Sequence, residues 1–381
     1  MKVTIAVDSF KGSMTSIEAG NAIKKGIIGA TNNQAIVNVI PVADGGEGTI
    51  EALTFRKQCE THKIPVTGPL GNKIFASYII TNEHTAIIEM AEAAGITLVP
   101  KEQRNPMLTT TVGVGELIKD ALNKNCRKFI IGIGGSATND CGIGMLQALG
   151  FKINDEHGTP VPFGANGVRL AVAIENSPLA SIIKECEFTI ACDVDNPLTG
   201  EKGCSKIFAP QKGATPEMVE QMDEWMNCFA EKLEKFVQDQ DSSITSNRYT
   251  PGGGAAGGIG FAFLMVLNGK LMSGAQIVIR ETKLEEHISQ SDIIIVGEGK
   301  LDSQSTMGKI PVTIAKLAKK HGKKVIAYAG IIEDKQAIGE SKFFDGAYEI
   351  NREGMPLDVA MIKENSIANL SRTVENTFSN Y

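Results

Sequence analysis

The pattern of apolar and polar positions at the start of the chain changes from strand-like to helix-like and back. Residues 2–7 (KVTIAV) form a continuous apolar run with the length of a buried strand. Residues 15–27 (TSIEAGNAIKKGI) then place apolar side chains at helical spacing behind a Thr or Ser cap. Residues 34–42 (QAIVNVIPV) are strand-like again. This order predicts a βαβ unit with parallel strands.

The C-terminal part of the chain repeats this alternation. Residues 291–299 (SDIIIVGEG) are a continuous β run, and residues 323–330 (KKVIAYAG) are another. Between them, residues 307–322 (MGKIPVTIAKLAKKHG) have the amphipathic pattern of a helix that ends in basic residues and Gly. A parallel α/β architecture is therefore expected at both ends of the chain.

The middle of the chain has a different pattern. Residues 63–80 (KIPVTGPLGNKIFASYII) contain a turn signal between two extended runs, which predicts a hairpin and hence a mixed sheet. Further strands are expected at 129–133 and 188–194, and a charged helix at 216–240. We predict a discontinuous α/β domain of residues 1–65 and 290–381, with a parallel sheet. A second α/β domain with a mixed sheet, residues 66–289, interrupts it.

Composition narrows the class of protein. A chain of 381 residues is long enough for two hydrophobic cores. The formal net charge of -6, without a long basic run, argues against a nucleic-acid partner. No run of about 18 apolar residues occurs, so we expect no membrane span and a cytoplasmic location. The seven cysteines include no CxxC pair, which disfavours a disulfide framework or a structural zinc site.

Glycine-rich segments follow several strand-like runs. Glycine permits close backbone approach, and successive amides at the start of a helix favour an anion. For any single segment a structural turn explains the glycines as well. The segments are ADGGEGT (43–49), GIGGSATND (132–140), PGGGAAGGIG (251–260) and GEGKLDSQSTMGK (297–309). Candidate phosphate- or substrate-binding residues from them are Gly134, Gly135, Ser136, Thr138, Asn139, Gly253 and Gly254, although a hinge between domains is an equal explanation for residues 252–258.

The segment GIGGSATND also admits a dinucleotide-binding interpretation. Gly132, Gly134 and Ala137 satisfy the G-x-G-x-x-A pattern, and Asp155 lies near the spacing expected of a ribose-binding carboxylate. An NAD-dependent oxidoreductase is therefore an alternative. The hydroxyl, amide and carboxylate of SATND suit a loop that positions phosphates or substrate oxygens better. A Walker-type NTPase is disfavoured because the P-loop lysine is missing.

Carboxylates recur at the ends of the predicted strands. In open α/β sheets ligands bind beyond the carboxyl ends of the strands, so these side chains are expected to share one cleft. Phosphoryl transfer needs oxygen ligands for magnesium, a base for an alcohol, and cations for the transferring phosphate. For each carboxylate taken alone, a helix cap or a solvated turn is an equally good explanation. The carboxylates are Asp8, Asp44, Glu47, Asp193, Asp195, Glu298 and Asp302.

Seven ordered motifs span almost the whole chain. They are AVDSFKGSMTSIEA (6–19), PVADGGEGT (41–49), GIGGSATNDCGIGMLQALG (132–150), CDVDNPLTG (192–200), FAPQKGA (208–214), GGGAAGGIGF (252–261) and GEGKLDSQSTMGKIP (297–311). Together these motifs resemble the bacterial glycerate kinase family. The resemblance implies a kinase that transfers phosphate from ATP to D-glycerate, and a Rossmann-like domain that a second α/β domain interrupts. It does not decide between the 2-phospho and the 3-phospho product.

Roles for single residues are assigned from chemistry. Asp44 or Asp302 is the expected general base, since an aspartate can accept the hydroxyl proton. Mg²⁺ would bind Asp193, Asp195 and Glu298. Anion contacts are expected from Lys11, with Asp8, Ser9 and Ser13 beside it, from Lys309, and from Arg104 in the segment RNPMLTTTVGVGE.

The expected partners are D-glycerate and a nucleotide, and the expected cofactors are ATP and Mg²⁺. Assembly into a homo-oligomer stays open. A non-catalytic protein that binds sugar acids is a further alternative to the enzyme.

Overall fold

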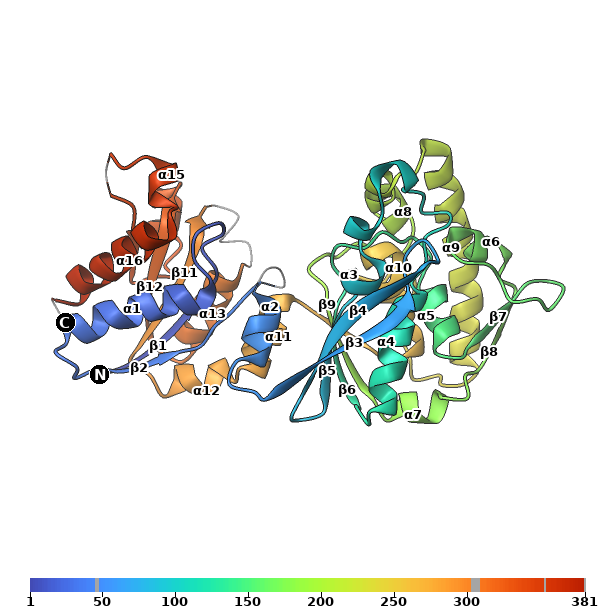
Figure 1. Cartoon of the computed structure of the whole chain (residues 1–381), viewed down its shortest axis with the longest axis horizontal. Helices are drawn as coiled ribbons and strands as arrows, with labels where there is room; N and C mark the ends of the chain where they lie inside the picture. Colours follow the sequence, from blue (N-terminus) through green and yellow to red (C-terminus); the bar gives the residue numbers. More distant parts are fainter. Residues whose placement is uncertain (45–47, 303–308, 353, 380–381) are drawn as a thin grey trace. The chain divides into compact units, whose positions relative to one another are not determined.

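The chain forms two compact units. The computed structural model describes residues 1–44, 48–302, 309–352 and 354–379. Unit 1 contains Met1–Arg56 and Ser273–Tyr381, and unit 2 contains Lys57–Met272. Figure 1 shows each unit as an α/β structure. The predicted fold class is confirmed, because a discontinuous α/β domain with a parallel sheet is interrupted by a second α/β domain with a mixed sheet.

The two crossings between the units lie earlier in the chain than the predicted 65/66 and 289/290. Position 65 lies within strand β3 (Cys59–Thr67), which pairs with β4 (Lys73–Thr81) over its whole length and so belongs to unit 2. Position 289 is the last residue of α12 (Leu284–Ser289), which packs against α13 (Ile310–Lys320) of unit 1. The boundary between the two units depends on the tertiary pairing of these elements, which the local sequence pattern does not reveal.

The sheet of unit 1 is parallel throughout, with the strand order β13-β12-β11-β1-β2. In order of appearance within the unit this is 2-1-3-4-5 read from β2, the order of a doubly wound sheet whose switch point lies between β1 and β11. Ligands of such sheets bind outside the carboxyl ends of the strands at that point. The topology therefore marks the ends of β1 (Lys2–Val7) and β11 (Ile293–Leu301) as the place for a site.

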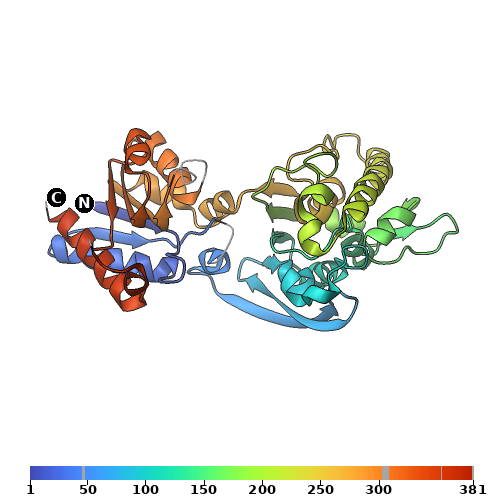
Figure 2. The same cartoon turned by 90° about the horizontal axis from the view of Figure 1, so that it is seen from above.

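Helices cover both faces of this sheet. In Figure 2 α1 (Ser16–Ala30) and α16 (Lys363–Phe378) lie on one face, with the strands between them and the helices of the other face. Contacts of α13 with β11 and β12 place it against the sheet as well. The remaining elements of unit 1 are β2 (Ile36–Val39), α2 (Thr49–Thr54), α11 (Gly274–Glu281), β12 (Lys324–Ile332), α14 (Lys335–Glu340), β13 (Gly346–Glu349) and α15 (Leu357–Ala360).

Local sequence explains why α1 begins where it does. Thr15 is the N-cap, and its side chain accepts a hydrogen bond from the backbone N–H of Glu18 while the Glu18 carboxylate accepts one from Thr15. This capping box satisfies two amides that would otherwise lack partners. Ile23 and Ile27 then point into a core that also contains Ile5. The cap and the buried stripe together fix the loop between β1 and α1, which carries Asp8 and Lys11.

Unit 2 is built on a mixed six-stranded sheet with the order β10-β9-β6-β5-β4-β3. The predicted hairpin at 63–80 is present as the antiparallel pair β3 and β4, whereas β5, β6, β9 and β10 are parallel. A separate antiparallel pair contains β7 and β8. The other strands are β5 (Thr85–Glu89), β6 (Lys128–Gly132), β7 (Lys152–Asn154), β8 (Ala173–Glu175), β9 (Glu187–Ala191) and β10 (Lys270–Met272).

One continuous core joins this sheet to its helices. Phe129 on β6 and Phe188 on β9 stack with ring centroids 4.7 Å apart, and Phe263 of α10 packs against Phe188. No helix among the described residues has the length and apolar character needed to cross a membrane. The helices of unit 2 are α3 (Ala91–Ala94), α4 (Val112–Asn123), α5 (Ile143–Ala148), α6 (Ala165–Leu170), α7 (Ala180–Lys184), α8 (Cys204–Phe208), α9 (Pro216–Gln238) and α10 (Ala255–Val266).

Candidate active site

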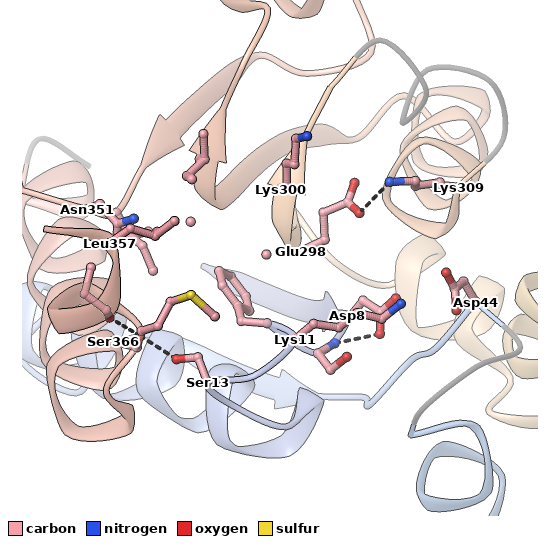
Figure 3. Close-up of a pocket in the computed structure, with 18 residues that line it drawn as sticks. Asp8, Lys11, Ser13, Asp44, Glu298, Lys300, Lys309, Asn351, Leu357 and Ser366 are labelled. Carbon is pink, nitrogen blue, oxygen red and sulfur yellow. Dashed lines mark hydrogen bonds and ion pairs between the residues drawn. The ribbon is translucent and has the colours of Figure 1, made fainter. Parts of the chain in front are cut away.

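A cavity of about 340 Å³ opens at the carboxyl ends of the unit 1 strands. Its wall comes from the segment after β1, the end of β11, the start of α13, the end of β12 and residues 350–366. This is the switch point that the strand order marks. The predicted residues that line it are Asp8, Ser9, Lys11, Ser13, Asp44, Glu298 and Lys309. Figure 3 shows Lys309 and Asp44 at one end of the cavity and Asn351 and Leu357 at the other.

Three carboxylates face the charged end. Asp8 is 9 % exposed and accepts a 2.6 Å hydrogen bond from the backbone N–H of Ser9. The pKa of Asp8 is raised to about 7, mainly by burial and also by the charges of Asp44 and Glu298, with the Ser9 amide and Lys11 acting in the opposite direction. The carboxylates therefore lie close enough to repel one another, which is a property of sites that receive cations.

Lysines stand among these carboxylates. Lys309, directly before α13, places its Nζ 3.6 Å from Glu298 Oε2 and 3.9 Å from Asp302 Oδ1. Lys300 Nζ lies 3.8 Å from Asp302 Oδ2 and 2.8 Å from Glu333 Oε1. Asp302, one of the two predicted bases, is thus held between two ammonium groups. Such pairing holds the carboxylate in place between the two lysines.

The serines of the first motif have separate positions. The Ser13 hydroxyl donates a 2.5 Å hydrogen bond to the Ser366 hydroxyl, which in turn donates to the carbonyl of Ala360. This chain ties the segment after β1 to α15 and α16. Ser9 contributes its amide to Asp8. The Ser13 hydroxyl is therefore engaged in structure, whereas Lys11 and Ser9 line the cavity beside Asp8.

In unit 2 the segment GIGGSATND surrounds a buried lysine. Lys212 is 2 % exposed, and its Nζ donates a 2.7 Å hydrogen bond to Ser136 Oγ and a 2.6 Å bond to the carbonyl of Thr138. Burial lowers the pKa of Lys212 to about 8. The prediction named Ser136 and Thr138 but gave no role to Lys212, although FAPQKGA was among the motifs. A local pattern does not reveal that its lysine turns inward.

A buried carboxylate anchors the same loop. Asp140 is fully buried and accepts hydrogen bonds from the Thr111 amide at 2.9 Å, the Thr111 hydroxyl at 2.8 Å and the Gly142 amide at 3.2 Å. Burial raises the pKa of Asp140, which these hydrogen bonds oppose. The Thr109 hydroxyl donates to the carbonyl of Ala137. The segment that carries Arg104 is therefore attached to the loop, as its predicted role requires.

Three buried polar atoms in this region lack a hydrogen-bond partner among the described residues. They are Arg104 Nε, Thr138 Oγ1 and Asn139 Oδ1. The Asn139 side chain otherwise donates a 3.0 Å hydrogen bond to Ser205 Oγ. Buried polar groups are normally paired, so these unpaired polar atoms, an N–H donor, a hydroxyl and an amide oxygen acceptor, suggest that a ligand or water completes the region. Gly134 and Gly135 stand at the exposed side of the same loop.

Gly253 and Gly254 do not have the geometry of a phosphate-binding loop, and this corrects their predicted role. Both are buried, and their amides already donate to the carbonyls of Thr250 and Asn196. A Cβ at Gly254 would stand 2.1 Å from the carbonyl oxygen of Pro197. The hinge interpretation of residues 252–258 is wrong too, because the whole segment lies within unit 2. These glycines serve close backbone packing.

The dinucleotide interpretation of Gly132–Ala137 lacks its structural context. In that motif the glycine loop opens directly into a helix. Here β6 ends at Gly132 and α5 begins only at Ile143. Asp155 lies in a turn after β7, where its carboxylate accepts hydrogen bonds from the amides of His157 and Thr159. It is therefore a turn residue and holds no ribose-binding position.

The predicted metal ligands belong to different units. Asp193 and Asp195 are exposed residues after β9 in unit 2, and Glu298 lies on β11 in unit 1. Within the described ranges no group of three or more His, Cys, Asp or Glu side chains is arranged to hold a metal. Glu47 and residues 303–308 of the last motif lie outside those ranges. The carboxylates of unit 1 nevertheless fit Mg²⁺, which is usually held by one or two carboxylates together with waters and phosphate oxygens.

Comparison with known proteins decides the family. Residues 3–381 match the model of the glycerate kinase family. The chain belongs to the glycerate kinase family. It is 43 % identical over 351 residues to the glycerate 2-kinase of Escherichia coli K12, covering 92 % of this chain and 90 % of that one. It is 41 % identical over 367 residues to a glycerate kinase of Halalkalibacterium halodurans, covering 96 % and 94 %.

A solved structure agrees with this membership of the glycerate kinase family. The crystal structure of a Salmonella typhimurium LT2 protein assigned as glycerate kinase 2 superposes with a TM-score of 0.87 at 37 % identity. The match covers 100 % of this chain and 98 % of that one. The predicted resemblance is thereby confirmed, and so is the prediction of an enzyme of the kinase class. The oxidoreductase and the non-catalytic binding protein are set aside.

Proposed function

We propose that the protein transfers the terminal phosphoryl group of ATP to a hydroxyl group of D-glycerate. The observation that carries this proposal is the charged end of the unit 1 cavity, where Asp8, Asp44 and Glu298 stand beside Lys11 and Lys309. Carboxylates that receive a cation and lysines that contact phosphate oxygens are two of the requirements of phosphoryl transfer. The names of the curated relatives support glycerate as the acceptor.

Asp8 and Glu298 are the residues that would hold Mg²⁺ in unit 1. Their oxygens are hard donors, the type that this ion prefers. When bound, the ion neutralises charge on the phosphate oxygens. Lys309, 3.6 Å from Glu298, stands where it can contact the transferring phosphate, and α13 behind it adds the positive end of its dipole.

Asp44 is the better of the two predicted bases. It lines the cavity together with Asp8 and Glu298, whereas Asp302 is not among the lining residues. A base must accept a proton from the acceptor hydroxyl as the bond to phosphorus forms. We therefore assign this step to Asp44, and assign to Asp302 the orientation of Lys309.

The buried lysine of unit 2 suits the carboxylate of the acceptor. Lys212 carries the charge, while the Ser136 hydroxyl and the unpaired Arg104 Nε and Thr138 Oγ1 add donors within the part of the chain that the structure describes. A carboxylate needs a cation and hydrogen-bond donors. The carboxylate that acts on Lys212 is Asp140, whose Oδ2 already accepts hydrogen bonds from the Thr111 amide and hydroxyl and whose Oδ1 accepts one from the Gly142 amide. We assign the glycerate carboxylate to this loop.

Release of ADP tests the reaction. With Mg²⁺ and ATP, D-glycerate is expected to give ADP at a rate that L-glycerate and lactate do not approach, and chelation of Mg²⁺ should abolish it. Absence of acceptor-dependent ADP would overturn the proposal.

We further propose the 2-phospho product, on the name of the Escherichia coli relative. Proton-coupled phosphorus NMR distinguishes the isomers, because a phosphate on the methine carbon couples to one proton and gives a doublet. A triplet, from the methylene carbon, would show the 3-phospho product instead.

A further inference from the structure

The end of the unit 1 cavity farthest from Lys309 and Asp44 is apolar. Its wall contains Phe10 and Ile350, which are 3 % and 2 % exposed, together with Leu357 and Met361. Leu357 is 50 % exposed and Met361 is 39 % exposed, although both are large apolar side chains at the mouth of a cavity. Exposed apolar groups around a concave site are typical of ligand contact. The charged end and the apolar end therefore receive different parts of one ligand.

Of the two substrates in the proposed reaction, only the nucleotide has an aromatic part. Glycerate is a three-carbon acid whose every carbon bears oxygen, so an apolar wall offers it no favourable contact. A nucleobase is flat and weakly hydrated on its faces, and it gains from stacking on apolar side chains. A cavity of about 340 Å³ also lies within the size range of sites for nucleotide-sized ligands.

Asn351 supplies a polar group at this apolar end. It follows β13 (Gly346–Glu349), lines the cavity, and is drawn next to Leu357 in Figure 3. Among the described residues its side-chain amide has no hydrogen-bond partner. An Asn amide offers one donor and one acceptor side by side, which matches the N6 amino group and N7 of adenine. Guanine presents two acceptors at the corresponding O6 and N7 and cannot pair with both groups.

We propose that the apolar half of this cavity, with Leu357 and Met361 as its walls and Asn351 as its polar group, binds the adenine ring of the nucleotide and selects adenine over guanine. The proposal rests on the proposed kinase reaction for the identity of the ligand. It places the phosphates at the Lys309 end, in agreement with the charges there. Asn351, Leu357 and Met361 thereby become specificity-determining residues of unit 1.

Calorimetric titration of the full-length protein with ADP, GDP and tripolyphosphate, each with Mg²⁺, tests this. Tripolyphosphate has the charges of the tail and lacks the base. Leu357→Asp is expected to weaken ADP about tenfold or more, because a carboxylate would face the ring. Asn351→Ala is expected to weaken ADP about tenfold and GDP much less. Neither variant should change the affinity for tripolyphosphate more than about twofold.

Val359→Asp is the matched control. Val359 lies on the same short helix, α15, and is 36 % exposed, but it does not line the cavity. It should bind all three probes like the unmodified protein. Four results would each overturn the proposal. Two are an equal loss of ADP affinity in Leu357→Asp and Val359→Asp, and an equal loss of affinity for ADP and for tripolyphosphate in the cavity variants. The others are unchanged ADP affinity in both cavity variants, and no ADP binding by the unmodified protein.

This binding assay separates the inference from the proposed reaction. If the unmodified protein forms no ADP with glycerate but the variants lose ADP affinity as expected, the acceptor assignment fails and the adenine site stands. If turnover with glycerate is present and the variants bind ADP normally, the adenine site alone is wrong.

Discussion

Unit 1 and unit 2 both place polar groups at the carboxyl ends of parallel strands, but they do so with different chemistry. The unit 1 cavity is lined by three carboxylates and three lysines, Asp8, Asp44 and Glu298 with Lys11, Lys300 and Lys309. In unit 2 a single buried ammonium, Lys212, is surrounded by hydroxyls and backbone carbonyls. Mixed charges suit a phosphate tail that carries a metal ion, whereas a buried ammonium among hydroxyls suits a small anion. We therefore propose a different ligand for each of the two regions.

The largest expected effect comes from removing the base in unit 1. Asp44→Asn should lower kcat by about 10²–10⁴-fold, the usual contribution of a general base, and leave KM for both substrates within a few-fold. Steady-state ADP release measures this, with thermal unfolding as the check on the fold. A kcat close to that of the unmodified enzyme would show that Asp44 is not the base.

The second effect concerns the cation in unit 2. Lys212→Met removes the charge but keeps the length of the side chain, and we expect KM for glycerate to rise about 10–100-fold because a charge-assisted contact is lost. Lys206→Met is the matched control, since Lys206 on α8 pairs with the surface residues Glu201 and Glu220. An unchanged KM for glycerate in Lys212→Met would show that the glycerate carboxylate does not bind at this loop.

The pH dependence of glycerate binding sharpens the same assignment. Because burial lowers the pKa of Lys212 to about 8, the ammonium is present below that pH and is lost as the pH rises through it. The neighbouring titratable groups do not hide the loss of the Lys212 charge. Asp140 is buried and hydrogen-bonded, and burial raises the pKa of Cys204 to about 12, so the Cys204 thiol stays neutral in this pH range. KM for glycerate should be flat below about pH 8 and rise above it. A rise of equal size in Lys212→Met would contradict the assignment.

A smaller effect is expected at Asp302. Asp302→Asn leaves Lys309 paired with Glu298 alone, so the lysine is less well oriented and kcat should fall about tenfold at most. If Asp302→Asn lowers kcat as much as Asp44→Asn does, Asp302 rather than Asp44 would be assigned as the base. The same ADP assay decides between them, with both variants measured side by side.

The smallest effect separates two neighbouring glycines of the unit 2 loop. Gly135 has a φ of +71°, so Gly135→Ala should cost about 1–2 kcal/mol of unfolding free energy. A Cβ at Gly134 would meet nothing within 4 Å, so Gly134→Ala should leave stability unchanged. Denaturant unfolding of both variants measures the difference. Equal stabilities would show that backbone strain does not constrain this loop.

The fold is predictable from the sequence because its strands and helices have strong local signals. Runs such as residues 2–7 and 291–299 are long enough and apolar enough to be buried strands, and both form adjacent strands of the unit 1 sheet. The rule that ligands bind at the carboxyl ends of parallel strands also predicts that the strand-end carboxylates share a cleft. Of these, Asp8, Asp44 and Glu298 line one cavity, whereas Asp193 and Asp195 belong to unit 2. These inferences depend on periodicity and topology, which a sequence carries directly.

Features that depend on burial could not be predicted from the sequence. Lys212 resembles any surface lysine in FAPQKGA, and only the fold shows that its ammonium lies under Ser136. Gly253 and Gly254 resemble a phosphate loop, but their amides are taken by Thr250 and Asn196 of unit 2. Asn351 lies outside every motif, and the cavity alone reveals it. Each of these depends on how the folded chain surrounds the residue.

The central claim is that the two regions serve different substrates, and crossed kinetics test it most directly. KM for ATP and KM for glycerate should both be measured in Leu357→Asp and in Lys212→Met by ADP release. The account predicts that Leu357→Asp raises only KM for ATP and that Lys212→Met raises only KM for glycerate. If each variant raises both constants by the same factor, the division of substrates between the unit 1 cavity and the unit 2 loop is contradicted.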